Sequence, residues 1–227
     1  TKRGSIVTPL KDRIGSQILT HYPHTRDIAK AITTQEVIVS KEKKNMIHIP
    51  ELACDILEQI GFEARKSEFV DSKSGVSARM SITAMENLIS TAERRLLISG
   101  DQKTSVRLVD FLGVIPAING KIEFVYEGEQ EGAEQISYHL ISESIKTIFP
   151  DYFPKIEELD KQEENGPYDK LLRWFFKNNE VIIENYLAEK EYKQTLEQVK
   201  GIESIIDTYQ KNCNIEDRYC MMEFLLW

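Results

Sequence analysis

The chain has 227 residues, of which 41% are hydrophobic, and its 37 acidic residues exceed its 29 Lys and Arg, for a formal net charge of -8. This length supports one large or two small domains with a sizeable core, while the acidic balance removes the electrostatic attraction on which nucleic-acid binding relies. No apolar run approaches the roughly 18 residues of a membrane span, and the start Thr-Lys-Arg-Gly has neither the apolar core of a signal peptide nor an initiating Met, so we expect a cytoplasmic chain and a piece of a longer protein.

The first 40 residues contain mostly turn signals and one short helical pattern. Gly and Pro recur in residues 1–25 around the β-branched pair Ile6 and Val7, which favours a loop or short strand followed by irregular turns. Residues 26–34 then show a helical pattern, and residues 36–40 alternate like an extended segment.

Four helices are predicted between residues 50 and 149. The first begins at Pro50 and stops at Gly61, and the second follows the N-cap residue Ser77 and ends near Gly100. The third and fourth are expected at residues 106–115 and 133–149. Between these two, a short apolar run and Gly-Glu repeats predict an exposed hairpin, in which solvated glutamates are favoured over a metal or partner site at Glu123, Glu127, Glu129 and Glu131.

The remaining third of the chain is also expected to be helical. The charged stretch 157–164 indicates a linker or a solvated helix, and Pro167 starts a further helix. Residues 187–209 show a helical pattern that Gly201 interrupts.

No complete active site is encoded by a recognisable motif. The phosphate-binding loop G-x-x-x-x-G-K-[ST] is absent, because the single Gly-Lys pair, at Gly120, is followed by Ile122. ATPases with this loop also use an Asp-Glu dipeptide, whose carboxylates bind magnesium and activate water, and no such dipeptide occurs in the chain. The three cysteines show no C-x-x-C spacing and the four histidines no H-E-x-x-H, so we expect buried free thiols and no metal site.

Two arginines stand in informative settings. Arg13 lies in a turn-rich segment, where pairing with Asp12 or another acid is the simplest interpretation. Arg79 lies in the first turn of the predicted second helix, where the partial positive charge of the helix end disfavours a cation unless an anion is near. A bound phosphate would satisfy both the guanidinium and the helix amides, whereas pairing with Glu86 or Asp71 is the alternative.

Several motifs follow one another along the chain: Ile-Val-Thr-Pro-Leu-Lys-Asp-Arg-Ile-Gly-Ser-Gln-Ile (6–18), Thr-His-Tyr-Pro (20–23), Ser-Gly-Val-Ser-Ala-Arg (74–79), Arg-Leu-Val-Asp (107–110) and the segment 120–132. In order and spacing, over roughly residues 5–153, they resemble AAA+ ATPases related to the magnesium-chelatase ATPase subunit. Residues 155–227 resemble the less distinctive tail of the same proteins.

The resemblance implies a mostly α chain in three parts. Residues 1–40 would be the C-terminal end of an α/β AAA+ core, residues 41–153 a helical lid with the Glu-rich hairpin inserted, and residues 154–227 a helical C-terminal extension. By position, Arg13 matches the arginine finger that enters the ATP site of a neighbouring subunit, and Arg79 matches the lid arginine that contacts phosphates in its own subunit.

The resemblance also implies the partners and cofactors. The whole protein would use ATP and Mg²⁺ and form a ring, most simply a hexamer. It would remodel a partner or assist metal insertion, acting with a protein that carries a von Willebrand factor A domain. This part alone would lack both nucleotide-binding motifs and hydrolyse nothing. The departure from the family pattern is Ile14, where chelatase subunits usually have Phe.

A helical protein-interaction domain without enzymatic activity is the alternative prediction. It would dock a partner through the aromatic run Trp174-Phe175-Phe176 or through the apolar C-terminal residues 221–227, although such clusters more often belong to a core. A transcription activator of the related enhancer-binding class finds no support, since no basic helix-turn-helix pattern is present.

Overall fold

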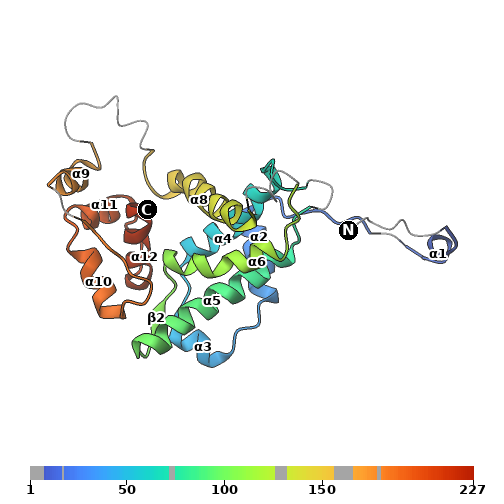
Figure 1. Ribbon diagram of the computed structural model, residues 1–227, viewed down its shortest axis with the longest axis horizontal. Helices are drawn as coiled ribbons and strands as arrows, with labels where there is room; N and C mark the ends of the chain where they lie inside the picture. The colour runs from blue at the N-terminus through green and yellow to red at the C-terminus, as the bar shows by residue number, and fades with distance from the viewer. Residues whose placement is uncertain (1–7, 17, 72–74, 126–131, 156–165, 178–179) are drawn as a thin grey trace.

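The computed structural model describes residues 8–16, 18–71, 75–125, 132–155, 166–177 and 180–227. The protein is mostly helical, as predicted, with one small sheet. Most helices form one body, from which an N-terminal arm ending in α1 projects (Figure 1). In chain order the elements are α1 (Thr8–Asp12), α2 (Arg26–Glu36), α3 (Lys41–Met46), β1 (Ile47–His48), α4 (Glu51–Lys66), α5 (Arg79–Ser99), β2 (Thr104–Ser105), the 3-10 helix η1 (Leu108–Val114), α6 (Ile115–Asn119), α8 (Ala133–Tyr152), α9 (Asp169–Phe175), α10 (Glu189–Glu197), α11 (Ile202–Tyr209) and α12 (Ile215–Leu226).

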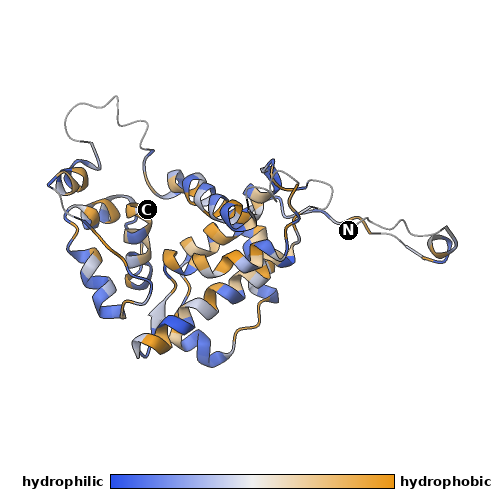
Figure 2. Cartoon of the chain, in the orientation of Figure 1, coloured by the Kyte–Doolittle hydropathy of each residue, from blue (hydrophilic) through white to orange (hydrophobic). Residues whose placement is uncertain are grey.

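The core lies between α4, α5, α6 and α8. Helix α4 packs against α8, α5 and α2, and α5 packs against η1 and α6. Hydrophobic residues concentrate on α5 and α6 in the middle of the body, whereas α3 and α10 are largely hydrophilic (Figure 2). Side chains such as Leu52, Ile56, Leu88 and Ile148 are fully buried there. Burial of these apolar faces is the main source of stability for such helices.

A two-stranded parallel sheet joins the start of α4 to the end of α5. Ile47 in β1 is paired with Thr104 in β2, and His48 is paired with Ser105. Two isolated antiparallel bridges, Val70 with Phe124 and Val76 with Ile122, occupy the place where a strand was suggested by the apolar run after Gly120. Of the predicted Glu-rich hairpin, Glu127, Glu129 and Glu131 lie outside the described residues, and Glu123 is exposed.

Several predicted helix boundaries are confirmed and others are wrong. Helices α2, α8, α10 and α11 occur where the patterns indicated, with Gly201 between the last two at φ +99°. The predicted stop at Gly61 is wrong, because α4 continues to Lys66. An interior Gly costs only about 1 kcal/mol relative to Ala, and burial of Ile60 and Ala64 on either side outweighs it.

The predicted third helix is also different in kind. A 3-10 helix begins at Leu108, and an α-helix follows only from Ile115. Arg107 is extended, and its backbone N–H donates to the Asp110 carboxylate at 2.8 Å, which fixes the start of η1. Three helices were not predicted at all, the short α1 and α3 and the C-terminal α12.

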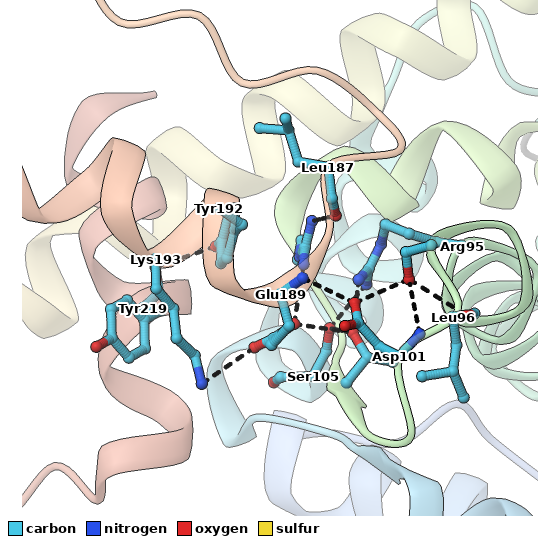
Figure 3. Close-up of polar contacts among 12 residues, drawn as sticks. Arg95, Leu96, Asp101, Ser105, Leu187, Glu189, Tyr192, Lys193 and Tyr219 are labelled. Atoms are coloured by element: carbon cyan, nitrogen blue, oxygen red, sulfur yellow. Dashed lines mark hydrogen bonds and ion pairs between the residues drawn. The ribbon is translucent and has the colours of Figure 1, made fainter.

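The C-terminal helices are joined to the body by a buried polar network (Figure 3). The Arg95 guanidinium on α5 donates to both Asp110 oxygens, at 3.3 and 2.8 Å, and to the Ser105 carbonyl at 2.8 Å. Arg107 donates to the Glu189 carboxylate at 2.8 Å and to the Leu187 carbonyl at 2.9 Å. The Arg-Leu-Val-Asp motif at 107–110 therefore attaches α10 to the end of α5.

No helix within the described ranges combines the length and the apolarity that crossing a membrane requires.

Candidate functional site

Arg79 is the first residue of α5, the longest helix of the protein. Ser77 was predicted as the N-cap, but it lies two residues before the first helical residue. Ala78 therefore occupies the N-cap position, and its side chain has no oxygen to accept a hydrogen bond. The Ser77 hydroxyl still accepts the Arg79 backbone N–H at 3.2 Å, and the Ser77 carbonyl accepts that of Met80 at 2.9 Å. The Arg79 side chain is left exposed at the helix end.

The first turn of α5 contains no acidic residue of its own, although the helix is 21 residues long. The Glu58 carboxylate of α4 reaches this turn, where it hydrogen-bonds the Ser81 side chain. Within the described part of the chain, Arg79 forms an ion pair neither with Glu86 nor with Asp71, the two alternatives that its sequence position left open. A cation beside the partial positive charge of a helix N-terminus creates a local field that favours an anion.

A second arginine, which the sequence analysis did not single out, lies near the same helix end. The Arg65 Nη1 and the Ser81 hydroxyl both flank Gly61, at 3.5 and 3.9 Å from the position that a Cβ would take there. The Arg65 guanidinium stacks on Phe62, 4.4 Å from the ring centroid, and on Tyr22, 4.9 Å away. Burial lowers the pKa of Arg65, which still leaves it charged. The signal, a three-residue spacing of Phe62 and Arg65 on one helix, was hidden because the helix was predicted to stop at Gly61.

Glu58 is a buried carboxylate on the same helix as Arg65, and its charge raises the pKa of Arg65 and so opposes the effect of burial. It accepts the Thr33 hydroxyl at 2.5 Å, and burial raises the pKa of its carboxyl group. Glu58 also hydrogen-bonds the Ser81 side chain, so it joins α2 and α4 to the first turn of α5, and the charges of Arg65 and Lys30 partly oppose the rise of its pKa.

Arg13 lies far from α5, directly after α1 at the end of the projecting arm (Figure 1). Its backbone N–H donates to the Leu10 carbonyl at 3.1 Å, and its side chain is exposed. The pairing with Asp12 considered from the sequence is not formed, since no described carboxylate makes an ion pair with Arg13. The arm also exposes apolar side chains, and both Ile18 and Leu19 are 85% exposed. One chain thus does not bring Arg13 and Arg79 together.

The exposed guanidinium and the amides at the start of α5 are groups of the kind that bind anions. No group of three or more His, Cys, Asp or Glu side chains suited to a metal ion occurs among the residues placed by the structure. The three cysteines are free, with Cys220 buried and Cys54 and Cys213 half-buried.

The aromatic run predicted as core or docking surface is divided, because Trp174 packs against the core while Phe176 is 80% exposed. Among the C-terminal residues, Met222 and Phe224 are buried and Trp227 is exposed.

Comparisons with known proteins leave the family open: no family model, no curated protein and no solved structure matches the chain.

Proposed function

We propose that this chain is the C-terminal part of an AAA+ ATPase of the magnesium-chelatase type, to which it contributes two phosphate-directed arginines. The observation that carries the proposal is Arg79, an exposed guanidinium that makes no ion pair with a described carboxylate and begins a long helix whose first turn contains no acidic residue. The motifs that resemble this family assign a lid arginine to the same position. Both arguments lead to a phosphate ligand through different routes.

Arg79 would act in its own subunit. The nucleotide supplies the phosphates, with Mg²⁺, when it is bound to the whole protein, and the phosphate-binding loop would lie in a segment outside residues 1–227. Amides at the start of α5 and the Arg79 guanidinium favour negative charge at the same place. Arg65, near the same end, adds positive charge to that surface.

Arg13 would act on the neighbouring subunit of a ring, most simply a hexamer. Its position on an arm away from α5 suits a residue that reaches another subunit rather than its own lid. An arginine supplied across an interface stabilises the charge that develops on the transferred phosphoryl group and is worth about 10³ to 10⁵ in rate. A partner with a von Willebrand factor A domain, remodelled or assisted in metal insertion, belongs to the same proposal.

ATP hydrolysis by the whole protein, including the segment that carries the phosphate-binding loop, tests the two roles. We expect Arg13→Ala to reduce the turnover number about 10³-fold. Mixing Arg13→Ala subunits with subunits that cannot hydrolyse ATP but retain Arg13 restores activity, because the finger acts in trans. Arg79→Ala is not restored by the same mixture, because it acts within its own subunit.

Arg173→Ala is the matched control, since Arg173 is an exposed arginine on α9. It is expected to hydrolyse ATP like the wild type. Equal activity of all three variants, or a longer gene without an upstream phosphate-binding loop, contradicts the proposal.

A helical interaction domain without ATPase activity is the second candidate. Ile18 and Leu19, adjacent and exposed on the N-terminal arm, and separately the exposed Phe176 after α9 support it, since large exposed apolar side chains often contact a partner. A start codon at or near Thr1 would favour this candidate over the motor.

A further inference from the structure

A groove beside the middle of α5 combines an apolar floor with a lysine-rich rim. The cavity has a volume of 780 Å³ and lies between the end of α2, α3, the β1 and β2 pair and the start of α10. Its apolar lining includes Val37, Val39, Ile49, Met85 and Ile89. The middle of α5 therefore forms part of the floor, away from Arg79 at its first residue.

One wall of the groove is a short stretch of extended chain. Val37 and Val39 line the cavity, whereas Ile38 between them is 90% exposed, which is the alternation of a strand. The Val37 amide caps α2 by donating to the Thr33 carbonyl. Among the described residues, no hydrogen bond is made by the amides of Ile38 and Val39 or by the carbonyls of residues 37–39. Residues 37–39 thus form an extended segment with an edge of backbone groups that no described residue pairs, and an extended peptide adds to such an edge.

The charges around the groove select the sign of the occupant. Four lysines line it, Lys43, Lys44, Lys103 and Lys193, against the carboxylates of Glu189 and Glu216. Lys43 is paired with Glu93 at 2.7 Å and Lys193 with Glu189 at 3.4 Å. Glu216 is 3.3 Å from the Nδ1 of His48.

Two of these lysines remain available. Lys44 and Lys103 are exposed and make no ion pair within the described ranges. On a chain whose net charge is -8, this lysine-rich rim complements an acidic ligand.

We infer that this groove binds an extended, acidic peptide segment of a partner protein. The peptide backbone pairs with the free edge at residues 37–39, and alternate apolar side chains rest on Met85 and Ile89. Carboxylates on the other face of the peptide meet Lys44 and Lys103. Backbone pairing supplies affinity while the apolar and charged contacts supply specificity. The inference is independent of any ATPase role.

Selection from a displayed library of random ten-residue peptides, with the whole 227-residue chain as bait, tests the inference. We expect enrichment of peptides in which acidic residues alternate with Val, Ile or Leu. The most enriched peptide, synthesised with a fluorescent label, then gives dissociation constants by anisotropy.

Charge reversal at Lys44→Glu/Lys103→Glu should weaken that peptide about 10-fold or more, as expected for two lost charge contacts. The control Lys155→Glu/Lys200→Glu makes the same charge change at exposed lysines that do not line the groove, and should bind within about 2-fold of wild type.

The strand edge is tested separately at Ile38, whose exposed side chain makes substitution mild. Ile38→Pro removes one backbone donor and should weaken the peptide about 2- to 10-fold, the worth of one hydrogen bond, whereas Ile38→Thr keeps the donor and should not. Failure to enrich acidic peptides, enrichment of basic ones, or equal binding by wild type and Lys44→Glu/Lys103→Glu with folding intact by circular dichroism would each overturn the inference.

Discussion

Glu223 on α12 is the buried carboxylate that attaches the last helix to η1, so its removal tests how the C-terminal part is held. Its Oε2 accepts the Leu108 amide at 2.9 Å and the Tyr192 hydroxyl at 2.8 Å, and its Oε1 accepts the Val109 amide at 3.3 Å. Burial raises the pKa of Glu223, and the three donors oppose this by favouring the charged form. Glu223→Ala leaves the Leu108 and Val109 amides without this acceptor, whereas the Tyr192 hydroxyl can still donate to the Tyr219 carbonyl at 3.2 Å.

Each buried donor left unpaired costs about 1 to 3 kcal/mol, and relief of the buried carboxylate offsets part of that sum. We expect Glu223→Ala to lower the free energy of unfolding by about 3 kcal/mol, a large fraction of the roughly 5 to 15 kcal/mol of a typical domain. Urea unfolding followed by circular dichroism measures the loss, and hydrogen exchange at the Leu108 and Val109 amides localises it.

The control Glu203→Ala changes an exposed glutamate on α11 and should be within about 0.5 kcal/mol of wild type. Equal stability of the two variants, with unchanged exchange at Leu108, would refute the role given to Glu223.

Four other expectations are testable on the same protein. The raised pKa of Glu223 means that the folded state binds this proton more tightly than the unfolded state. The unfolding free energy of wild type relative to Glu223→Gln should therefore fall as pH rises from about 4.3 through the folded-state pKa. Parallel urea titrations of the two proteins measure this difference. Gly201→Ala should lower the free energy of unfolding by more than about 2 kcal/mol, because at φ +99° the added Cβ would lie 2.9 Å from the Leu171 nitrogen. Gly100→Ala, at φ +74° with no atom within 4 Å of the added Cβ, should lower it by only about 1 kcal/mol. Thermal unfolding measures both. Gly113→Ala should cost about 1 to 3 kcal/mol, since its Cβ would lie 1.9 Å from the Thr91 Oγ1, and Thr91→Ala in the same chain should restore part of the loss in urea. Burial raises the pKa of the Cys54 thiol from 9 to about 11, so its reaction with iodoacetamide at pH 8, followed by mass spectrometry, should be about 100-fold slower than that of an ordinary thiol.

The helices that were predicted correctly have one polar face and clear ends. Helix α5 shows an apolar stripe and a terminal Gly100 in the left-handed conformation, and α11 begins directly after Gly201. Helix α12 escaped prediction because residues 220–224 are all buried, so its apolar residues show no period that distinguishes a face. Helix α3 escaped for the opposite reason, since none of its residues is buried and Ser40 supports it by a local cap.

Contacts between distant segments could not be read from a single sequence. The pattern Arg-Leu-Val-Asp at 107–110 was noticed only as part of a resemblance, and its physical role depends on Glu189, some 80 residues later. Arg79 was singled out correctly as a residue near a helix start, because that inference used only local signals. Whether a carboxylate would neutralise it depended on tertiary structure, and the described residues provide none.

The two proposed binding surfaces share α5 yet should respond independently to substitution. Arg79 begins the helix, and Met85 and Ile89 lie about 9 and 15 Å further along it at 1.5 Å per residue. Substitutions separated by more than about 7 to 10 Å without common partners usually act additively. Arg79→Ala should therefore leave binding of the selected acidic peptide unchanged, and Lys44→Glu/Lys103→Glu should leave ATP hydrolysis by the whole protein unchanged. A change in peptide affinity with Arg79→Ala would mean that α5 transmits binding from one surface to the other, because Arg79 does not line the groove and makes no hydrogen bond or ion pair with the described residues that do.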